Sequence, residues 1–270
     1  MDTGKPNVAL VLSSGGARGI AHIGVIEELL ERGYTITSVS GASMGSLVGG
    51  IYAAASFEGI LAFQEWLSVI DKKKMFDLMD FTLSWDGLVK GDRVVKALTR
   101  LIPDRYIEDL HIPYSAVATD ILTGEEVVFE KGRLFDAIRA SISIPSVFKP
   151  YKLDNRILVD GCVSNPLPLS RIRRQKGDIL VAADVCAPSE NPPKKSDINY
   201  YSLLGHTTNI MIQKLTATQV EKYTPDILIN IPYDGYSVME FYKSKEIMKI
   251  GREKARKALD DFESTYINNQ

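Results

Sequence analysis

The chain has 270 residues, 45% of them hydrophobic, and a formal net charge of -2 at neutral pH. This length and apolar content suffice for one large α/β core, so we expect a single domain over residues 1–270. Positive and negative charges are well mixed along the chain, without the basic stripe that nucleic-acid binding requires, and we expect no nucleic-acid partner.

The cysteines and the N-terminal residues bear on where the protein is located. Cys162 and Cys186 are too few for a secreted disulfide scaffold and are wrongly spaced for a tetrahedral metal site. Residues 1–6 contain no basic segment that leads into an apolar stretch, and no run of about 18 uncharged apolar residues occurs. These features favour a soluble, cytoplasmic protein without a signal peptide.

The N-terminal part of the chain alternates strand and helix patterns. Short apolar runs that end at turn residues predict strands buried on both faces, and apolar residues at helical spacing predict helices. Gly33 stands where a left-handed C-terminal helix cap belongs. The predicted elements are a strand at residues 8–12, a helix at 20–30, a strand at 36–40 and a helix at 47–55.

The rest of the chain continues this alternation. A hairpin through Thr123-Gly124 is predicted to join strands at 114–120 and 125–129. Further strands are predicted at 157–160, 179–185 and 227–231, and helices at 92–102, 134–141, 201–223 and 243–262. Because parallel strands need crossover connections, this order predicts a three-layer α/β/α fold with a mainly parallel central sheet. We expect a motif-bearing core over about 8–232 and a C-terminal helix within about 237–268.

A Gly-x-Ser-x-Gly pentapeptide occupies residues 41–45, between a predicted strand and a predicted helix. A nucleophile elbow needs a sharp turn of this kind, because the turn exposes the serine hydroxyl and the glycines keep side chains away from it. The helix that follows would direct its positive N-terminal end at the site. The motif indicates Ser43 as a candidate nucleophile, although small residues at these positions also occur in close-packed turns.

A glycine-containing turn, Ser-Ser-Gly-Gly-Ala-Arg-Gly, follows the first predicted strand at residues 13–19. Consecutive glycines leave backbone N–H groups uncovered at a helix start, where they can hold an anion such as the tetrahedral oxyanion of acyl transfer. A dinucleotide-binding loop is the rival interpretation, but it needs glycine where Ser14 stands and an acidic residue after the second strand. An ordinary tight turn with a solvated Arg18 is the simplest alternative.

Asp160-Gly161 ends the strand predicted at residues 157–160. Functional residues of such folds lie at the carboxyl ends of strands, and a carboxylate placed there could reach the Ser43 hydroxyl directly. A carboxylate is a poor base for an alcohol in water, so the site would have to desolvate it and stabilise charge as it forms. Taken alone, an Asp-Gly pair is a common turn.

These motifs together resemble the patatin-like phospholipase family, in which the Gly-Gly-x-Arg-Gly turn, the Gly-Ala-Ser-Met-Gly elbow and the Asp-Gly pair occur in this order. The resemblance covers about residues 8–232 and includes further stretches at 118–120, 123–125, 141–145 and 165–168. It implies that the protein has a patatin-like fold and hydrolyses acyl esters of lipids without a metal or other cofactor. It also implies that Ser43 is the nucleophile and Asp160 its base.

By the same resemblance, backbone N–H groups near Gly15, Gly16 and Ala17 form the oxyanion hole, with Arg18 supporting it. The expected partner is a lipid or another acyl-ester substrate, and we expect transient, peripheral contact with a membrane surface.

Two residues depart from the family pattern. Ser14 replaces the first glycine of the turn, and Cys162 replaces the second glycine after Asp160. Neither change removes a catalytic atom. Cys162 could narrow the site or act as a reactive thiol, but a small buried apolar side chain is the expectation.

Several alternatives stay open. A Ser-Asp-His triad would need His206, the one histidine after Asp160, but the ordinary helical pattern around it favours a Ser-Asp dyad. An acyltransferase would use the same acyl-serine intermediate, and a catalytically silent interaction module could share the fold. The apolar stretch at 75–85, with Phe81 and Trp85, is interpreted as core packing, with a lid or acyl-chain wall as the alternative.

Overall fold

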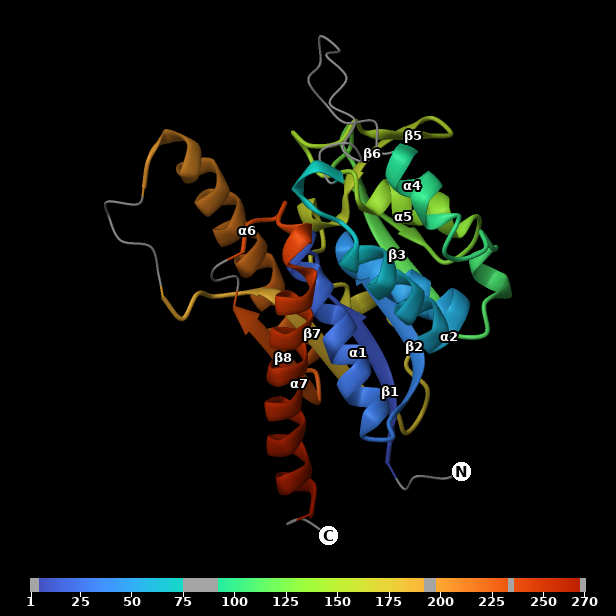
Figure 1. The fold of residues 1–270 in the computed structure, drawn as a ribbon, viewed down its shortest axis with the longest axis vertical. Helices are drawn as coiled ribbons and strands as arrows, with labels where there is room; N and C mark the ends of the chain where they lie inside the picture. The colour runs from blue at the N-terminus through green and yellow to red at the C-terminus, as the bar shows by residue number, and fades with distance from the viewer. Residues whose placement is uncertain (1–4, 75–91, 192–197, 233–235, 268–270) are drawn as a thin grey trace.

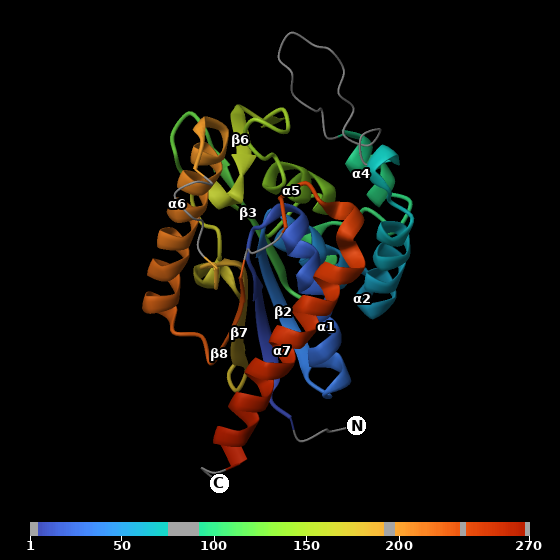
Figure 2. The same ribbon diagram turned by 60° about the vertical axis from the view of Figure 1, so that its left-hand side comes forward.

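The computed structural model describes residues 5–74, 92–191, 198–232 and 236–267. Its strands form one eight-stranded sheet in the order β5-β6-β3-β2-β1-β7-β8, with β4 paired to β3 outside this path. Figure 1 and Figure 2 show helices on both faces of the sheet, which confirms the predicted three-layer α/β/α architecture. The predicted apolar stretch at 75–85 lies outside the described residues.

Five adjacent strands, from β3 to the β8 edge of the sheet, pair in parallel. Alternate residues of the first strand face opposite sides: Val8 and Leu10 join the large core on one face, and Ala9 and Val11 join a smaller one on the other. Because both faces of β1 are buried, its residues 8–12 are a continuous apolar run. The five parallel strands are β3 (Tyr114–Asp120), β2 (Thr35–Ala42), β1 (Asn7–Leu12), β7 (Ile179–Ala187) and β8 (Ile227–Pro232).

The other strands are antiparallel. β4 (Glu126–Phe129) pairs with β3 through the predicted hairpin, β6 (Arg156–Asp160) pairs with the opposite edge of β3, and β5 (Tyr151–Leu153) pairs with β6. The sequence did not predict β5, because three residues are too few to show a period.

The helices cover the two faces of the sheet unequally (Figure 2). α6 (Tyr200–Tyr223) contacts β7 on the face with the smaller core. The larger core lies under α1 (Ala21–Glu31), α2 (Met44–Ser68), α4 (Asp92–Leu98), α5 (Leu134–Ser141) and α7 (Ser244–Ile267).

Helix α2 contains a break at Ala55 and Ser56, where φ and ψ are -140° and 15°, then 53° and -148°. The helix predicted at 47–55 corresponds to the first half of α2, and the second half was not predicted. In the described part of the chain, α2 alone has the length and apolar composition of a membrane-spanning helix, and 61% of its apolar window is buried inside the fold.

Candidate active site

Ser43 lies at a sharp turn between the end of β2 and the start of α2. Its backbone has φ 53° and ψ -123°, a region that non-glycine residues rarely occupy. Both flanking glycines are required by space: a Cβ atom on Gly41 would overlap the backbone of Gly45, and one on Gly45 would overlap the carbonyl of Leu12. The sharp turn predicted at 41–45 is therefore present, and the positive end of α2 lies directly behind Ser43.

The hydroxyl of Ser43 donates a hydrogen bond of 2.5 Å to Oδ2 of Asp160. Both side chains are buried, with 3% of Ser43 and 0% of Asp160 exposed. Strand pairing explains how they meet, because Ala42 pairs with Val117 of β3, and the next β3 residue, Ala118, pairs with Asp160. Asp160 thus lies at the carboxyl end of its strand, as expected, and reaches Ser43 across β3 from a strand that is antiparallel to β3.

Burial sets the electrostatics of Asp160. It raises the pKa of the carboxyl group from 3.8 to about 6, although hydrogen bonds from Ser43 and Cys162 lower it. The Cys162 backbone N–H donates to Oδ1 at 2.8 Å, while Oδ2 accepts from Ser43. A carboxylate with this pKa is still ionised at neutral pH and is a stronger base than an exposed aspartate.

Cys162 lines a cavity beside Asp160 and Ser43. Burial, and then the neighbouring carboxylate, raise the pKa of its thiol, so the thiol is neutral at physiological pH. Because the thiolate is the nucleophilic form of cysteine, this environment argues against a reactive thiol and favours the packing role that the sequence suggested.

The turn after β1 brings two free N–H donors to the same cavity. In the described part of the chain, the N–H groups of Gly15 and Gly16 have no acceptor, and both glycines line a cavity with Ser43. The N–H of Ala17 instead donates to the carbonyl of Val238 at 2.8 Å, so Ala17 is not the free donor that the sequence predicted. Gly16 has φ 58° and packs against Val238, which leaves no space for a side chain.

Arg18 is buried and holds this turn, instead of being solvated. Its Nε donates to the carbonyl of Gly15 at 3.2 Å, and its Nη2 donates to Oδ1 of Asn209 on α6 at 3.4 Å. The carboxyl group of Asp184, on β7, is affected by the positive charge of Arg18. Burial raises the pKa of this carboxyl group to about 6, while its hydrogen bond from Cys186 and the Arg18 charge lower it. The sequence did not lead us to predict a role for Asp184, although a charged residue inside an apolar strand is a signal that could have indicated one.

Ser141, at the end of α5, anchors the elbow. The backbone N–H of Ser43 donates to Oγ of Ser141 at 2.8 Å, and that hydroxyl donates to the carbonyl of Val117 at 2.6 Å. The sequence places Ser141 in a family-like stretch but suggests no role for it, because a serine that anchors a turn has the same local pattern as any buried serine.

No hydrogen bond in the described part of the chain joins a histidine to Ser43 or Asp160. His206 is partly exposed on α6. His22 is fully buried, and burial lowers its pKa to about 4, so its neutral ring donates from Nε2 to the carbonyl of Ser13 at 2.8 Å. This geometry favours a dyad over a triad.

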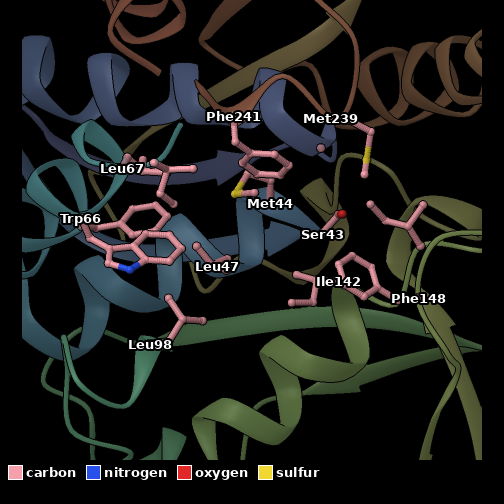
Figure 3. Close-up of a pocket in the computed structure, with 14 residues that line it drawn as sticks. Ser43, Met44, Leu47, Trp66, Leu67, Leu98, Ile142, Phe148, Met239 and Phe241 are labelled. Carbon is pink, nitrogen blue, oxygen red and sulfur yellow. The ribbon is translucent and has the colours of Figure 1, made fainter. Parts of the chain in front are cut away.

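Ser43 stands between two cavities of different chemistry. The first has a volume of about 70 Å³, and apart from Ser43 and the indole of Trp66 its lining side chains are apolar. Figure 3 shows Met44 and Leu47 near Ser43, with Trp66 and Leu67 on the far side. The second has a volume of about 470 Å³, and its lining includes the polar side chains of Arg18, Asp160, Thr208, Asn209 and Ser237.

The chain is similar in sequence to several known proteins. An uncharacterized NTE family protein of Mycobacterium tuberculosis is 40% identical over 195 residues, which are 72% of this chain and 53% of that protein. Lysophospholipase NTE1 of Candida glabrata is 27% identical over 270 residues, covering 90% of this chain and 15% of that protein. The chain therefore spans about half the length, or less, of these curated relatives.

A solved structure, that of VipD from Legionella pneumophila, superimposes with a TM-score of 0.52 and 17% identity, over 95% of this chain and 67% of that one. This likeness concerns the fold alone. A family model described as patatin-like phospholipase matches residues 10–171, which include the glycine turn, the elbow and Asp160. Because this match covers more than half of the 270 residues, the chain belongs to the patatin-like phospholipase family.

Proposed function

We propose that this chain is a serine hydrolase of acyl lipid esters, with Ser43 as the nucleophile and Asp160 as its acid-base partner. The observation that carries the proposal is the 2.5 Å hydrogen bond between their side chains, with Ser43 held on a strained turn. Membership of the patatin-like phospholipase family and the apolar cavity beside Ser43 support an acyl lipid as the substrate.

In the first step, Oγ of Ser43 attacks the carbonyl carbon of the ester while its proton passes to Oδ2 of Asp160. Negative charge develops on the carbonyl oxygen, which the N–H groups of Gly15 and Gly16 stabilise by on the order of 3 kcal/mol per donor. The bond to the alcohol then breaks, and Asp160 returns the proton to the leaving oxygen. The products are an acyl ester of Ser43 and a free alcohol.

Water completes the hydrolysis in a second step. Asp160 accepts a proton from the water as its oxygen adds to the acyl carbon, and the departing Ser43 oxygen takes that proton back. A carboxylic acid is released and Ser43 is regenerated. An acyltransferase would differ only in using another acceptor, so added lysophospholipid should not capture the acyl group in preference to water.

The test uses a panel of phospholipids, lysophospholipids and simple esters with the wild type and Ser43→Ala. Ser43→Ala should lower the hydrolysis rate at least about 10³-fold and leave the circular dichroism spectrum unchanged. A fluorophosphonate probe should label the wild type at Ser43, as peptide mass spectrometry would show. Undiminished hydrolysis by Ser43→Ala would refute the proposal. Failure of the folded wild type to react with the probe would instead favour a silent interaction module.

Exposed apolar side chains near the polar cavity support transient contact with a lipid surface, and a cytoplasmic location with such contact is part of the proposal. On α6, Gly205 and Asn209 line this cavity, whereas Leu204 and Met211 are 69% and 61% exposed. The double variant Leu204→Ser, Met211→Ser should sediment less with phosphatidylcholine vesicles and keep its activity on a soluble ester. Unchanged sedimentation would argue against the contact.

A further inference from the structure

Both halves of α2 line the apolar cavity. Met44 and Leu47 come from the first half, and Phe63, Trp66 and Leu67 come from the second. A straight helix would separate Met44 from Trp66 by about 33 Å, at 1.5 Å per residue. The break in α2 turns the second half back, so that it closes the cavity that the first half opens beside Ser43.

The wall of the cavity farthest from Ser43 is apolar and tightly packed. Figure 3 shows Trp66 on the side away from Ser43, with Leu98 of α4 beside it. The rings of Phe63 and Trp66 stack, with centroids 5.7 Å apart and an angle of 16° between their planes. Phe63 is 2% exposed and Leu98 0%, so the packing around them restricts their rotamers.

The lining decides what chemical group the cavity accepts. A polar or charged group placed there would lose its hydrogen bonds to water without replacement. A hydrocarbon chain loses none, and each methylene that leaves water strengthens binding roughly fourfold. The cavity therefore selects the apolar part of a substrate.

The position of Asp160 indicates which part of the ester binds in the apolar cavity. Asp160 lines the polar cavity and does not line the apolar one in the described part of the chain. In the proposed reaction, Asp160 protonates the leaving alcohol, so the alcohol must lie on the polar side. The acyl chain then extends from the Ser43 carbonyl site in the opposite direction, toward α2.

We propose that the apolar cavity binds the acyl chain, and that a wall of Phe63, Trp66 and Leu98 sets the longest straight chain the site accepts. This inference rests on the proposed function of Ser43. The substrate class is an ester with one straight aliphatic acyl chain at the reacting carbonyl and a polar alcohol on the other side.

The test is a series of soluble p-nitrophenyl esters with straight acyl chains of increasing length. For the wild type, kcat/KM should rise with each methylene until the chain reaches the wall, and then fall. Trp66→Ala and Leu98→Ala should each move the maximum to longer chains. For an ester two methylenes beyond the wild-type maximum, kcat/KM should rise roughly tenfold. Leu47→Phe, placed between Ser43 and the wall, should move the maximum to shorter chains.

Phe57→Ala is the matched control, because Phe57 lies on the same half of α2 but outside the described lining of the cavity. It should keep the wild-type profile. If Trp66→Ala does not fold, Leu98→Ala and Leu47→Phe still test the wall. Unchanged profiles in the folded wall variants, with Ser43→Ala inactive, would overturn this inference alone. Undiminished hydrolysis by Ser43→Ala would overturn the proposed function as well.

Discussion

The two cavities that meet at Ser43 differ in chemistry. Apolar side chains from α2, α4 and the segment after α5 line one of them, whereas Arg18, Asp160 and Asn209 contribute polar groups to the other. An ester has the same asymmetry, with an apolar acyl chain on one side of its carbonyl and a polar alcohol on the other. From this difference we expect the apolar cavity to control the preference for the acyl chain and the polar cavity to control the preference for the alcohol. Ser43 and Asp160, at the boundary, should control the rate for every ester.

The largest effect should come from removing the base at this boundary. Asp160→Asn should lower kcat about 10³-fold for every ester, whatever its acyl chain or alcohol, because no other described group accepts the Ser43 proton. Steady-state kinetics on two acyl series and two alcohols would measure this. Near-normal turnover of even one ester by Asp160→Asn would contradict the assignment of Asp160 as the base for every ester.

The pKa of Asp160 also predicts a pH dependence. Since the carboxylate must be ionised to act as a base, kcat/KM should fall about tenfold per pH unit below about pH 6. The folded pKa is raised from 3.8 to about 6, so this group's stabilisation is present below pH 3.8 and lost as pH rises through 6. At pH 8 the buried charge should destabilise the fold by about 3 kcal/mol.

Asp160→Asn carries no such charge and should melt at a higher temperature than the wild type at pH 8. The difference should shrink as the pH falls below 6, which thermal denaturation across pH would show. Equal melting temperatures at pH 8 would mean that Asp160 is not buried as an anion.

A smaller effect should follow from loosening the elbow that separates the cavities. Ser141→Ala leaves the N–H of Ser43 buried without its acceptor, which should destabilise the fold by about 1–3 kcal/mol. We expect kcat to fall roughly tenfold with little change in KM. Ser143→Ala is the matched control, since its hydroxyl bonds Arg139 and not the elbow. Equal kcat for both variants would show that Ser141 does not position Ser43.

A change in the polar cavity should alter the preference for the alcohol and leave the acyl-length profile as it is. Asn209→Leu removes a polar group from the lining and also the acceptor of the Arg18 Nη2 hydrogen bond, so activity should fall for every ester. In addition, the ratio of kcat/KM between choline-containing and glycerol-containing esters should change by about two- to tenfold. The acyl-length profile should stay as in the wild type. A shifted acyl profile in Asn209→Leu would show that the two cavities are not independent.

The smallest effect should come from His206→Ala, which we expect to change kcat/KM less than about twofold, because His206 has no described hydrogen bond to the pair. If His206→Ala were as damaging as Asp160→Asn and still folded, the dyad would have to be abandoned for a triad.

Local patterns in the sequence were enough to locate most strands and the three motifs. Apolar runs predicted strands such as β1 and β7 because these are buried on both faces. The spacing of Gly41 and Gly45 predicted a sharp turn because no side chain fits there. These features depend on residues a few positions apart. Motif order and resemblance then connected Ser43 with Asp160, but not the route by which they meet.

Only the tertiary structure decided that route. Ser43 and Asp160 lie 117 positions apart, and they meet because an antiparallel strand ends beside β3 at the level of the elbow. The same holds for the Ala17 N–H, which donates to Val238, and for the break that folds α2 back along its own cavity. Burial of Asp160 and the resulting rise of its pKa also arise only when distant segments exclude water, and no pattern of neighbouring residues records that.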